Sequence, residues 1–270
     1  MRFQSTFGGR HELGQNFLRN PSTIDRFVAV VRDTEGSILE VGAGDGAITR
    51  KLSLLNRDIT AIDVDEQLVK RLQRDIPTVR VERADALRFS LDFPVIVGNI
   101  PFNLTTPILR RLLKSSTWNH AVLLTQWEVA RKRAGVGGCT MMTAQAAPWY
   151  VFELRGRVPA RHFAPQPSVD GGILHITRRE KSLVSSAERR NYESFVRAAF
   201  TGRGRTLPQI LGRASGAPSN QASRVLSELS LGDVRLPRDL RADTWAVLWS
   251  RLTQSRQPHD QKGARRDFRQ

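Results

Sequence analysis

The residues with the clearest chemical potential form a short stretch at positions 98–103, with the sequence GNIPFN. The Asn99 side chain offers an acceptor oxygen, Pro101 a rigid bend and Phe102 a flat ring. Adenine has a planar ring and a weakly nucleophilic exocyclic amine. If the Asn99 oxygen and the Ile100 carbonyl accept the two protons of that amine, its lone pair is drawn toward an incoming electrophile, while Phe102 stacks on the base. The alternative is a strand end capped by an Asn turn, with a phenylalanine in the core.

Apolar runs predict the elements that would position this stretch. Residues 94–97 precede it and are typical of a buried strand in a parallel sheet, whose carboxyl end is where open α/β sheets place their chemistry. Strands that alternate with amphipathic helices predict a doubly wound parallel sheet with right-handed crossovers. Two later strands, near Val151–Val158 and Gly171–Ile176, have no helix between them and are expected to pair antiparallel at one edge. The other expected strands span residues 37–41, 59–62, 79–82 and 121–124, and helices are expected around residues 24–31, 47–55, 68–76 and 108–113.

A glycine-rich turn follows the first of these strands. Gly42, Gly44 and Gly46 alternate with other residues, which indicates close approach of a ligand to the backbone. The G-x-G-x-G spacing and the preceding Glu40 differ from the G-x-G-x-x-G pattern of dehydrogenases that bind a pyrophosphate.

Acidic residues follow the next two strands. Asp63 ends the second strand about twenty residues after the glycine turn, as recognition of ribose hydroxyls requires, and Asp85 follows the third strand, where it could accept from an adenine amine. Asp65 is an alternative for the ribose, and helix N-capping is the structural alternative for Asp63 and Asp85. S-adenosylmethionine has a ribose, an adenine and a cationic sulfonium but no phosphates, so an acid-lined pocket suits it better than a dinucleotide.

Composition limits the class of protein. The 270 residues include 42 Lys and Arg against 26 Asp and Glu, a net charge of +16, which implies a polyanionic partner such as nucleic acid or an anionic membrane surface. No apolar run approaches the roughly 18 residues that span a bilayer, and the first residues lack the apolar core of a secretory signal. We therefore expect a cytoplasmic protein without membrane insertion. A single cysteine, Cys139, excludes an internal disulfide framework, and the five histidines do not cluster in sequence, so no metal site is expected.

The texture of the chain changes near residue 178, where short arginine-rich helical patterns broken by Gly and Pro begin. After residue 253 hydrophobicity disappears. We expect four parts: a basic N-terminal segment (1–19), an S-adenosylmethionine-dependent catalytic domain (20–177), a small all-helical RNA-binding domain (178–252) and a disordered basic tail (253–270).

In order and in kind, these motifs resemble those of the ribosomal RNA adenine N6-methyltransferases. The resemblance extends from about residue 10 to residue 252 and implies a Rossmann-like class I methyltransferase sheet, of the α/β class, followed by a small C-terminal all-helical domain. It rests on residues 15–18, 40–46, 63, 85, 99–102 and the F-x-P-x-P-x-V pattern at 163–169.

Within this family the chain resembles the erythromycin-resistance (Erm) branch at residues 11–16, 99–101, 125–130 and 149–150. That resemblance implies methylation of the N6 of an adenine in 23S rRNA, resistance to macrolide, lincosamide and streptogramin antibiotics, and a monomer acting on free RNA or an assembling large subunit. The alternatives are a small-subunit rRNA adenine dimethyltransferase, a non-catalytic RNA-binding protein that retains the fold, and an NAD-dependent dehydrogenase.

The resemblance also implies roles for individual residues. Asp63 stands where a longer Glu is commoner and Phe102 where Tyr is frequent, so ribose contact is expected to be looser while stacking survives. Catalytic roles are implied for Asn99, Ile100, Pro101 and Phe102; cofactor contacts for Asn16, Leu18, Gly42, Gly44, Asp63, Asp85, Ala86 and Asn99; and we expect RNA contacts by Arg131, Lys132, Arg133, Arg161 and Phe163.

Overall fold

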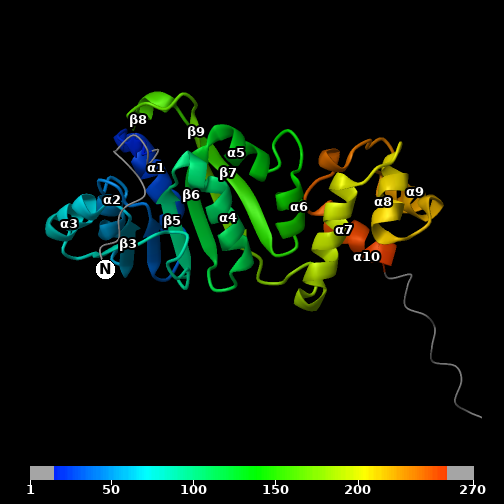
Figure 1. The fold of residues 1–270 in the computed structure, drawn as a ribbon, viewed down its shortest axis with the longest axis horizontal. Helices are drawn as coiled ribbons and strands as arrows, with labels where there is room; N and C mark the ends of the chain where they lie inside the picture. Colours follow the sequence, from blue (N-terminus) through cyan, green and yellow to red (C-terminus); the bar gives the residue numbers. More distant parts are fainter. Residues whose placement is uncertain (1–14, 254–270) are drawn as a thin grey trace, which may run out of the picture. The chain divides into compact units, whose positions relative to one another are not determined.

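The computed structural model describes residues 15–253. Predictions that concern residues 1–14 and 254–270, including most of the N-terminal segment and the tail, lie outside the described residues. The described chain divides into two compact units, one up to Gly137 together with Trp149–Lys181, the other comprising Gly138–Pro148 and the residues from Ser182 onward. Figure 1 shows strands and helices alternating in the blue-to-green part of the chain, and helices without strands in its yellow-to-red part.

The first unit is built on a seven-stranded sheet, whose strands are β2 (Ile38–Val41), β3 (Ile59–Asp63), β4 (Arg80–Arg83), β5 (Val95–Asn99), β6 (His120–Gln126), β7 (Tyr150–Val158) and β9 (Gly171–Arg178). Their order is β4-β3-β2-β5-β6-β9-β7. The first five in this order are parallel, whereas β9 pairs antiparallel with β6, and β7 pairs antiparallel with β9. This confirms the predicted Rossmann-like α/β fold, including the antiparallel strands at one edge.

Burial explains the composition of the central strands. Every residue of β2 and the first four residues of β5 are buried. Register pairs Leu39 with Ile96 and Val97 with Val122, so apolar side chains occupy consecutive positions rather than alternate ones. A parallel strand covered on both faces has this pattern.

The first unit contains the helices α1 (Pro21–Arg32), α2 (Thr49–Leu52), α3 (Glu66–Asp75), α4 (Thr105–Lys114) and α5 (Trp127–Arg133). Of these, α2, α3 and α4 connect strands of the parallel part of the sheet. Asn20 caps α1 through its side-chain oxygen, which accepts from the Thr23 N–H. The helix expected over residues 47–55 is shorter: α2 begins only after the glycine turn has closed, and the 3₁₀ helix η1 (Ser53–Leu55) follows it.

A second, two-stranded sheet joins distant parts of the first unit. Strand β1 (Phe17–Leu18) pairs antiparallel with β8 (Phe163–Ala164), with Leu18 opposite Phe163. The Arg19 N–H also donates to the His162 carbonyl at 2.8 Å. The segment that precedes α1 is therefore attached to the F-x-P-x-P motif.

The second unit consists of α6 (Met141–Ala146), α7 (Arg189–Thr201), α8 (Leu207–Ser215), α9 (Ser219–Glu228) and α10 (Thr244–Thr253). Aromatic rings form its centre, including Phe195 and Trp245 at a centroid distance of 6.0 Å. Residues 138–148, expected within the catalytic domain, belong to this unit because the Tyr192 hydroxyl donates to the Ala144 carbonyl and Gln145 Nε2 donates to the Glu193 carbonyl. Across residues 15–253, no helix is both long and apolar enough to cross a membrane.

Candidate active site

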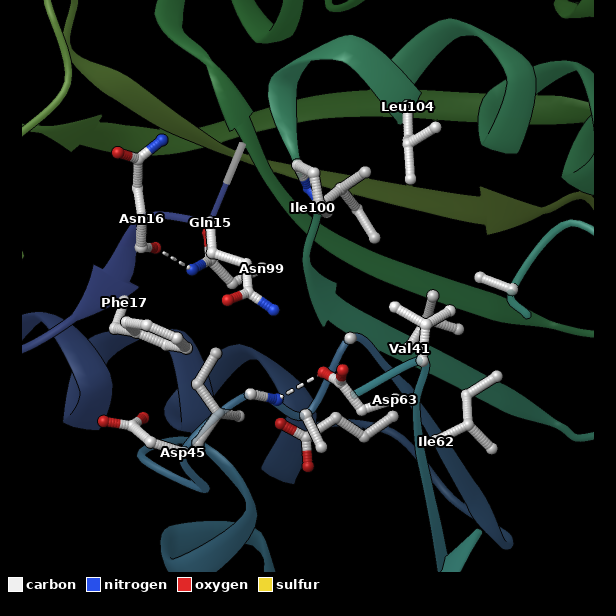
Figure 2. A pocket seen from close by; sticks show the side chains of 18 of the residues that line it. Gln15, Asn16, Phe17, Val41, Asp45, Ile62, Asp63, Asn99, Ile100 and Leu104 are labelled. Atoms are coloured by element: carbon white, nitrogen blue, oxygen red, sulfur yellow. Dashed lines mark hydrogen bonds between the residues drawn. The ribbon is translucent and has the colours of Figure 1, made fainter. Parts of the chain in front are cut away.

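A pocket lies at the carboxyl ends of β2, β3 and β5. Figure 2 shows the apolar side chains of Ile100 and Leu104 on one side of it and the carboxylates of Asp45 and Asp63 on the other. All eleven positions predicted to catalyse or to bind the cofactor line this pocket, so the fold brings together stretches that are far apart in sequence. The lining comprises residues 15–18, 40–45, 47–48, 62–64, 84–86, 99–102, 104 and 108.

The glycine turn forms the floor of the pocket. Gly42, Gly44 and Gly46 have positive φ angles of 72°, 56° and 82°, which L-residues with side chains rarely adopt. A Cβ atom on Gly44 would lie 2.9 Å from the ring of Phe17. The backbone therefore reaches the pocket surface, with Phe17 of the N-terminal segment packed directly on it.

Asp63 fixes this turn. One carboxylate oxygen accepts from the Gly44 N–H at 2.8 Å and the other from the Asp65 N–H at 2.9 Å (Figure 2 draws the first bond). Burial raises the pKa of Asp63 above its ordinary value. The helix-capping role belongs to Asp65, which accepts from the N–H groups of Gln67 and Leu68 at the start of α3. Asp63 is thus a pocket residue rather than a cap.

Asp85 serves as neither helix cap nor buried group. One of its carboxylate oxygens accepts from the Leu87 N–H at 2.8 Å, within a turn that no helix follows, and its side chain is 47% exposed. Ala86 lines the pocket beside it.

Glu40 is a pocket residue whose role the sequence reasoning missed. It is almost fully buried at the end of β2, and its Oε2 atom has no hydrogen-bond partner among the described residues. Burial raises the pKa of Glu40 from 4.5 to about 8; the Thr49 hydroxyl partly offsets this effect, and the neighbouring Asp63 and Asp45 add to it. An acid within an otherwise apolar strand was the available signal. Such a set of carboxyl groups favours a cationic ligand and disfavours phosphates.

Asn99 is oriented by the N-terminal segment. Its Nδ2 donates to the Asn16 carbonyl at 2.7 Å, so the amide nitrogen is occupied and the side-chain oxygen is left as the acceptor (Figure 2). Ile100 is 1% exposed as a whole residue and lines the pocket next to Asn99. Phe102 is only partly buried and begins the 3₁₀ helix η2 (Phe102–Leu104), so it is not the core phenylalanine of the alternative interpretation.

The residues predicted to contact RNA have different environments. Arg131, Lys132 and Arg133 form the last turn of α5, where Arg131 pairs with Glu128 at 3.0 Å. Arg161 is exposed in the 3₁₀ helix η3 (Ala160–His162).

Phe163 requires a correction. Its ring is 4% exposed and belongs to the hydrophobic core of the first unit, because β8 pairs with β1 and turns this side chain inward. This burial contradicts the predicted RNA contact.

Two histidines that are distant in sequence meet in the fold. His120 Nδ1 and His175 Nε2 lie 3.3 Å apart near the amino end of β6, away from the pocket. Burial foremost, with smaller effects of Arg155 and His120, lowers the pKa of His175 from 6.5 to about 4. The pair is structural. Among residues 15–253, no group of three or more His, Cys, Asp or Glu side chains could hold a metal ion.

Comparison with known proteins decides the family. The family model of ribosomal RNA adenine dimethylases matches residues 6–243. The chain belongs to this family. It is 48% identical to the mycinamicin-resistance protein MyrB of Micromonospora griseorubida over 246 residues, which cover 90% of this chain and 78% of MyrB. It is 49% identical to an rRNA adenine N-6-methyltransferase of Corynebacterium diphtheriae over 214 residues, 77% of this chain and 85% of that protein.

Among solved structures, the 23S rRNA methyltransferase ErmE superposes with a TM-score of 0.80 at 32% identity, covering 88% of this chain and 99% of ErmE. These matches confirm the predicted family and the predicted fold, and with them an enzyme of the S-adenosylmethionine-dependent methyltransferases.

Proposed function

We propose that this enzyme transfers a methyl group from S-adenosylmethionine to the N6 of an adenine in 23S rRNA, and that the modification confers resistance to macrolide, lincosamide and streptogramin antibiotics. The observation that carries the proposal is the oriented amide of Asn99 at the mouth of an acid-lined pocket with a glycine floor. Similarity to a mycinamicin-resistance protein and to a 23S rRNA methyltransferase supports the large subunit as the substrate.

The pocket residues fit S-adenosylmethionine. Asp63 and Asp45, beside a Glu40 oxygen that has no partner within the described part of the chain, suit a ligand with a positive charge and no phosphates. When bound, this cofactor supplies an electrophilic methyl group on a cationic sulfur. Asn16, Leu18, Gly42 and Gly44 would hold its methionine end, Asp63 its ribose, and Asp85 with Ala86 its adenine.

The chain's own groups then orient the target. The Asn16 carbonyl holds Asn99 Nδ2, so the Asn99 oxygen and the Ile100 carbonyl can accept the two protons of the target amine and direct its lone pair. Pro101 fixes the bend between strand and helix, and the partly buried Phe102 ring stacks on the target base. Catalysis comes from positioning and fixed dipoles.

The basic surface supplies affinity for RNA. The net charge of +16 and the cationic groups of Arg131, Lys132, Arg133 and Arg161 attract phosphates. The target adenine must leave its stack, which costs a few kcal/mol and less in a loop. The substrate is therefore free RNA or an assembling large subunit in the cytoplasm. The enzyme acts on it as a monomer.

The test is methyl transfer from labelled cofactor to purified 23S and 16S rRNA, with primer extension to locate the mark. We expect incorporation at an adenine of 23S rRNA, and a raised inhibitory concentration of erythromycin in a sensitive strain that expresses the protein. Adjacent marks in 16S rRNA would assign the chain to the small-subunit branch. Incorporation into neither RNA would refute the proposal.

A further inference from the structure

One wall of the pocket stands on a segment without regular structure. Residues 84–94 connect β4 to β5 and contain neither helix nor strand, whereas a helix lies in each connection β2–β3, β3–β4 and β5–β6. Residues 84–86 of this segment line the pocket. Because no ladder of hydrogen bonds holds such a loop, other groups must fix its position.

Hydrogen bonds around Asp85 fix the local shape of the loop but do not connect this turn to the rest of the unit. The N–H groups of Arg88 and Phe89 each donate to the Asp85 carbonyl at 2.9 Å, and the Leu87 N–H donates to a carboxylate oxygen of Asp85. These bonds close one turn around Asp85. They leave open where that turn lies relative to the rest of the pocket.

Backbone bonds attach the two ends of the loop: the Ala84 N–H donates to the Asp63 carbonyl at 3.0 Å, and the Pro94 carbonyl accepts from the Asn119 N–H at 2.8 Å. Arg111 of α4 attaches the turn between them. Its Nη1 donates to the Ala86 carbonyl at 2.6 Å, and its Nη2 donates to the Phe89 carbonyl. The planar guanidinium thereby spans both ends of the turn with charge-assisted bonds. Farther along the loop, the Thr117 hydroxyl donates to the Leu91 carbonyl at 3.0 Å.

The same helix begins next to the catalytic stretch. Residues 99–101 lead through η2 directly into α4, which carries Arg111 two turns later. Helix α4 therefore fixes the positions of both the loop that carries Asp85 and the stretch that carries Asn99.

We propose that Arg111 is a positioning residue that sets the Asp85 carboxylate against the purine edge of the cofactor and so determines the preference for a 6-amino over a 6-oxo purine. This inference rests on the proposed function of the pocket. One Asp85 oxygen accepts from the Leu87 N–H. The other lies 3.7 Å from Arg88 Nε in an ion pair whose arginine is 88% exposed, and it can accept from a 6-amino group. A 6-oxo group would present an acceptor to that carboxylate, and the two would repel. The preference depends on where the carboxylate lies, and hence on the Arg111 bonds.

The chain contains a matched control. Arg57 also grips a loop through backbone carbonyls: its Nε donates to Gly36 at 2.7 Å, and its Nη1 donates to Thr34 at 2.9 Å and to Val31 at 3.2 Å. That loop precedes β2, at the amino end of the sheet, and none of its residues lines the pocket. Removing the Arg57 hydrogen bonds should disturb this loop and leave the pocket wall formed by residues 84–86 unchanged.

The experiment measures calorimetric affinities of the full chain for S-adenosylhomocysteine and S-inosylhomocysteine. We expect Arg111→Met to weaken adenosyl binding about tenfold, the effect of about one lost positioned hydrogen bond, and to leave inosyl binding nearly unchanged, so the preference falls by the same factor. Arg57→Met should lower Tm and leave the preference intact. Without ligand, hydrogen exchange at the Leu87, Arg88 and Phe89 amides should accelerate in Arg111→Met and not in Arg57→Met.

Equal losses for both ligands in Arg111→Met, or an unchanged preference, would overturn the inference and leave Arg111 a merely structural residue. Should that variant not fold, Arg111→Lys carries the test: it keeps the charge but cannot span two carbonyls with one planar fork, and an unchanged preference there overturns the inference as well. A wild-type protein that binds neither ligand would instead refute the proposed function of the pocket.

Discussion

The two ends of the central sheet treat buried polar groups in opposite ways. At the carboxyl end, Glu40 has an oxygen without a partner among residues 15–253, and Asn99 is held so that its oxygen remains available. At the amino end, polar groups bind one another: His120 meets His175, and Arg57 binds three backbone carbonyls. One end keeps acceptors for a ligand and the other uses its donors for the fold. Function and stability are therefore separated along the strands.

Burial also moves pKa values in opposite directions at the two ends. The pKa of Glu40 rises to about 8 and that of His175 falls to about 4, in each case because burial disfavours the charged form. Opposite pH dependences of stability follow, and they offer a way to test the comparison.

The largest expected effect is at the carboxyl end. Asn99→Asp keeps an acceptor oxygen but has no N–H for the Asn16 carbonyl, so kcat/KM should fall about 10²–10³-fold, and Asn99→Ala should abolish turnover. RNA affinity and Tm should change little, as single-turnover methyl transfer, filter binding and calorimetry would show. Methyl transfer by Asn99→Ala at the parental rate would show that the Asn99 oxygen at the carboxyl end of the sheet does not serve catalysis.

The next effect concerns Glu40 in protein without cofactor. Its folded-state pKa lies above 4.5, so the folded state keeps a proton that the unfolded state releases, and the free energy of unfolding falls as pH rises from 4.5 toward 8. Glu40→Gln should remove this fall, which is at most about 1.4 kcal/mol per pH unit. Urea unfolding at several pH values between 5 and 7.5 measures it. Equal slopes in both proteins would mean that Glu40 is ionised in the fold.

His175 should act with the opposite sign. Because its folded-state pKa is depressed, the unfolded state binds a proton first as pH falls below 6.5, and stability declines by up to about 3 kcal/mol by pH 4. His175→Gln should flatten that decline and leave methyl transfer at neutral pH unchanged. An altered transfer rate would contradict the separation of the two ends.

The smallest expected effect is at Phe102. Phe102→Ala should reduce kcat/KM about tenfold because stacking on a base is worth about 1–3 kcal/mol, whereas Phe102→Tyr should stay within about twofold of the parent. Steady-state kinetics on 23S rRNA distinguishes the two variants. Equal losses in both would point to the fit of the ring rather than to stacking.

Local pattern predicted the sheet and the site to different extents. The apolar runs of β3 and β5 each end at a polar residue of the pocket, so the strand ends at Asp63 and Asn99 could be predicted from sequence alone. The burial of Phe163, the His120–His175 contact and the membership of residues 138–148 in the helical unit depend on partners far along the chain. Arg111 was hidden because one arginine in a basic helix carries no local mark of the carbonyls that it binds.

The pairing of β1 with β8 has a consequence for the timing of folding. Residues 17 and 18 are synthesised well before their partner strand, which contains residues 163 and 164. A nascent chain therefore cannot form the β1–β8 pairing until most of the sheet has left the ribosome. The Asn16 carbonyl that orients the Asn99 amide thus comes into place late, only after residues 163 and 164 have been synthesised.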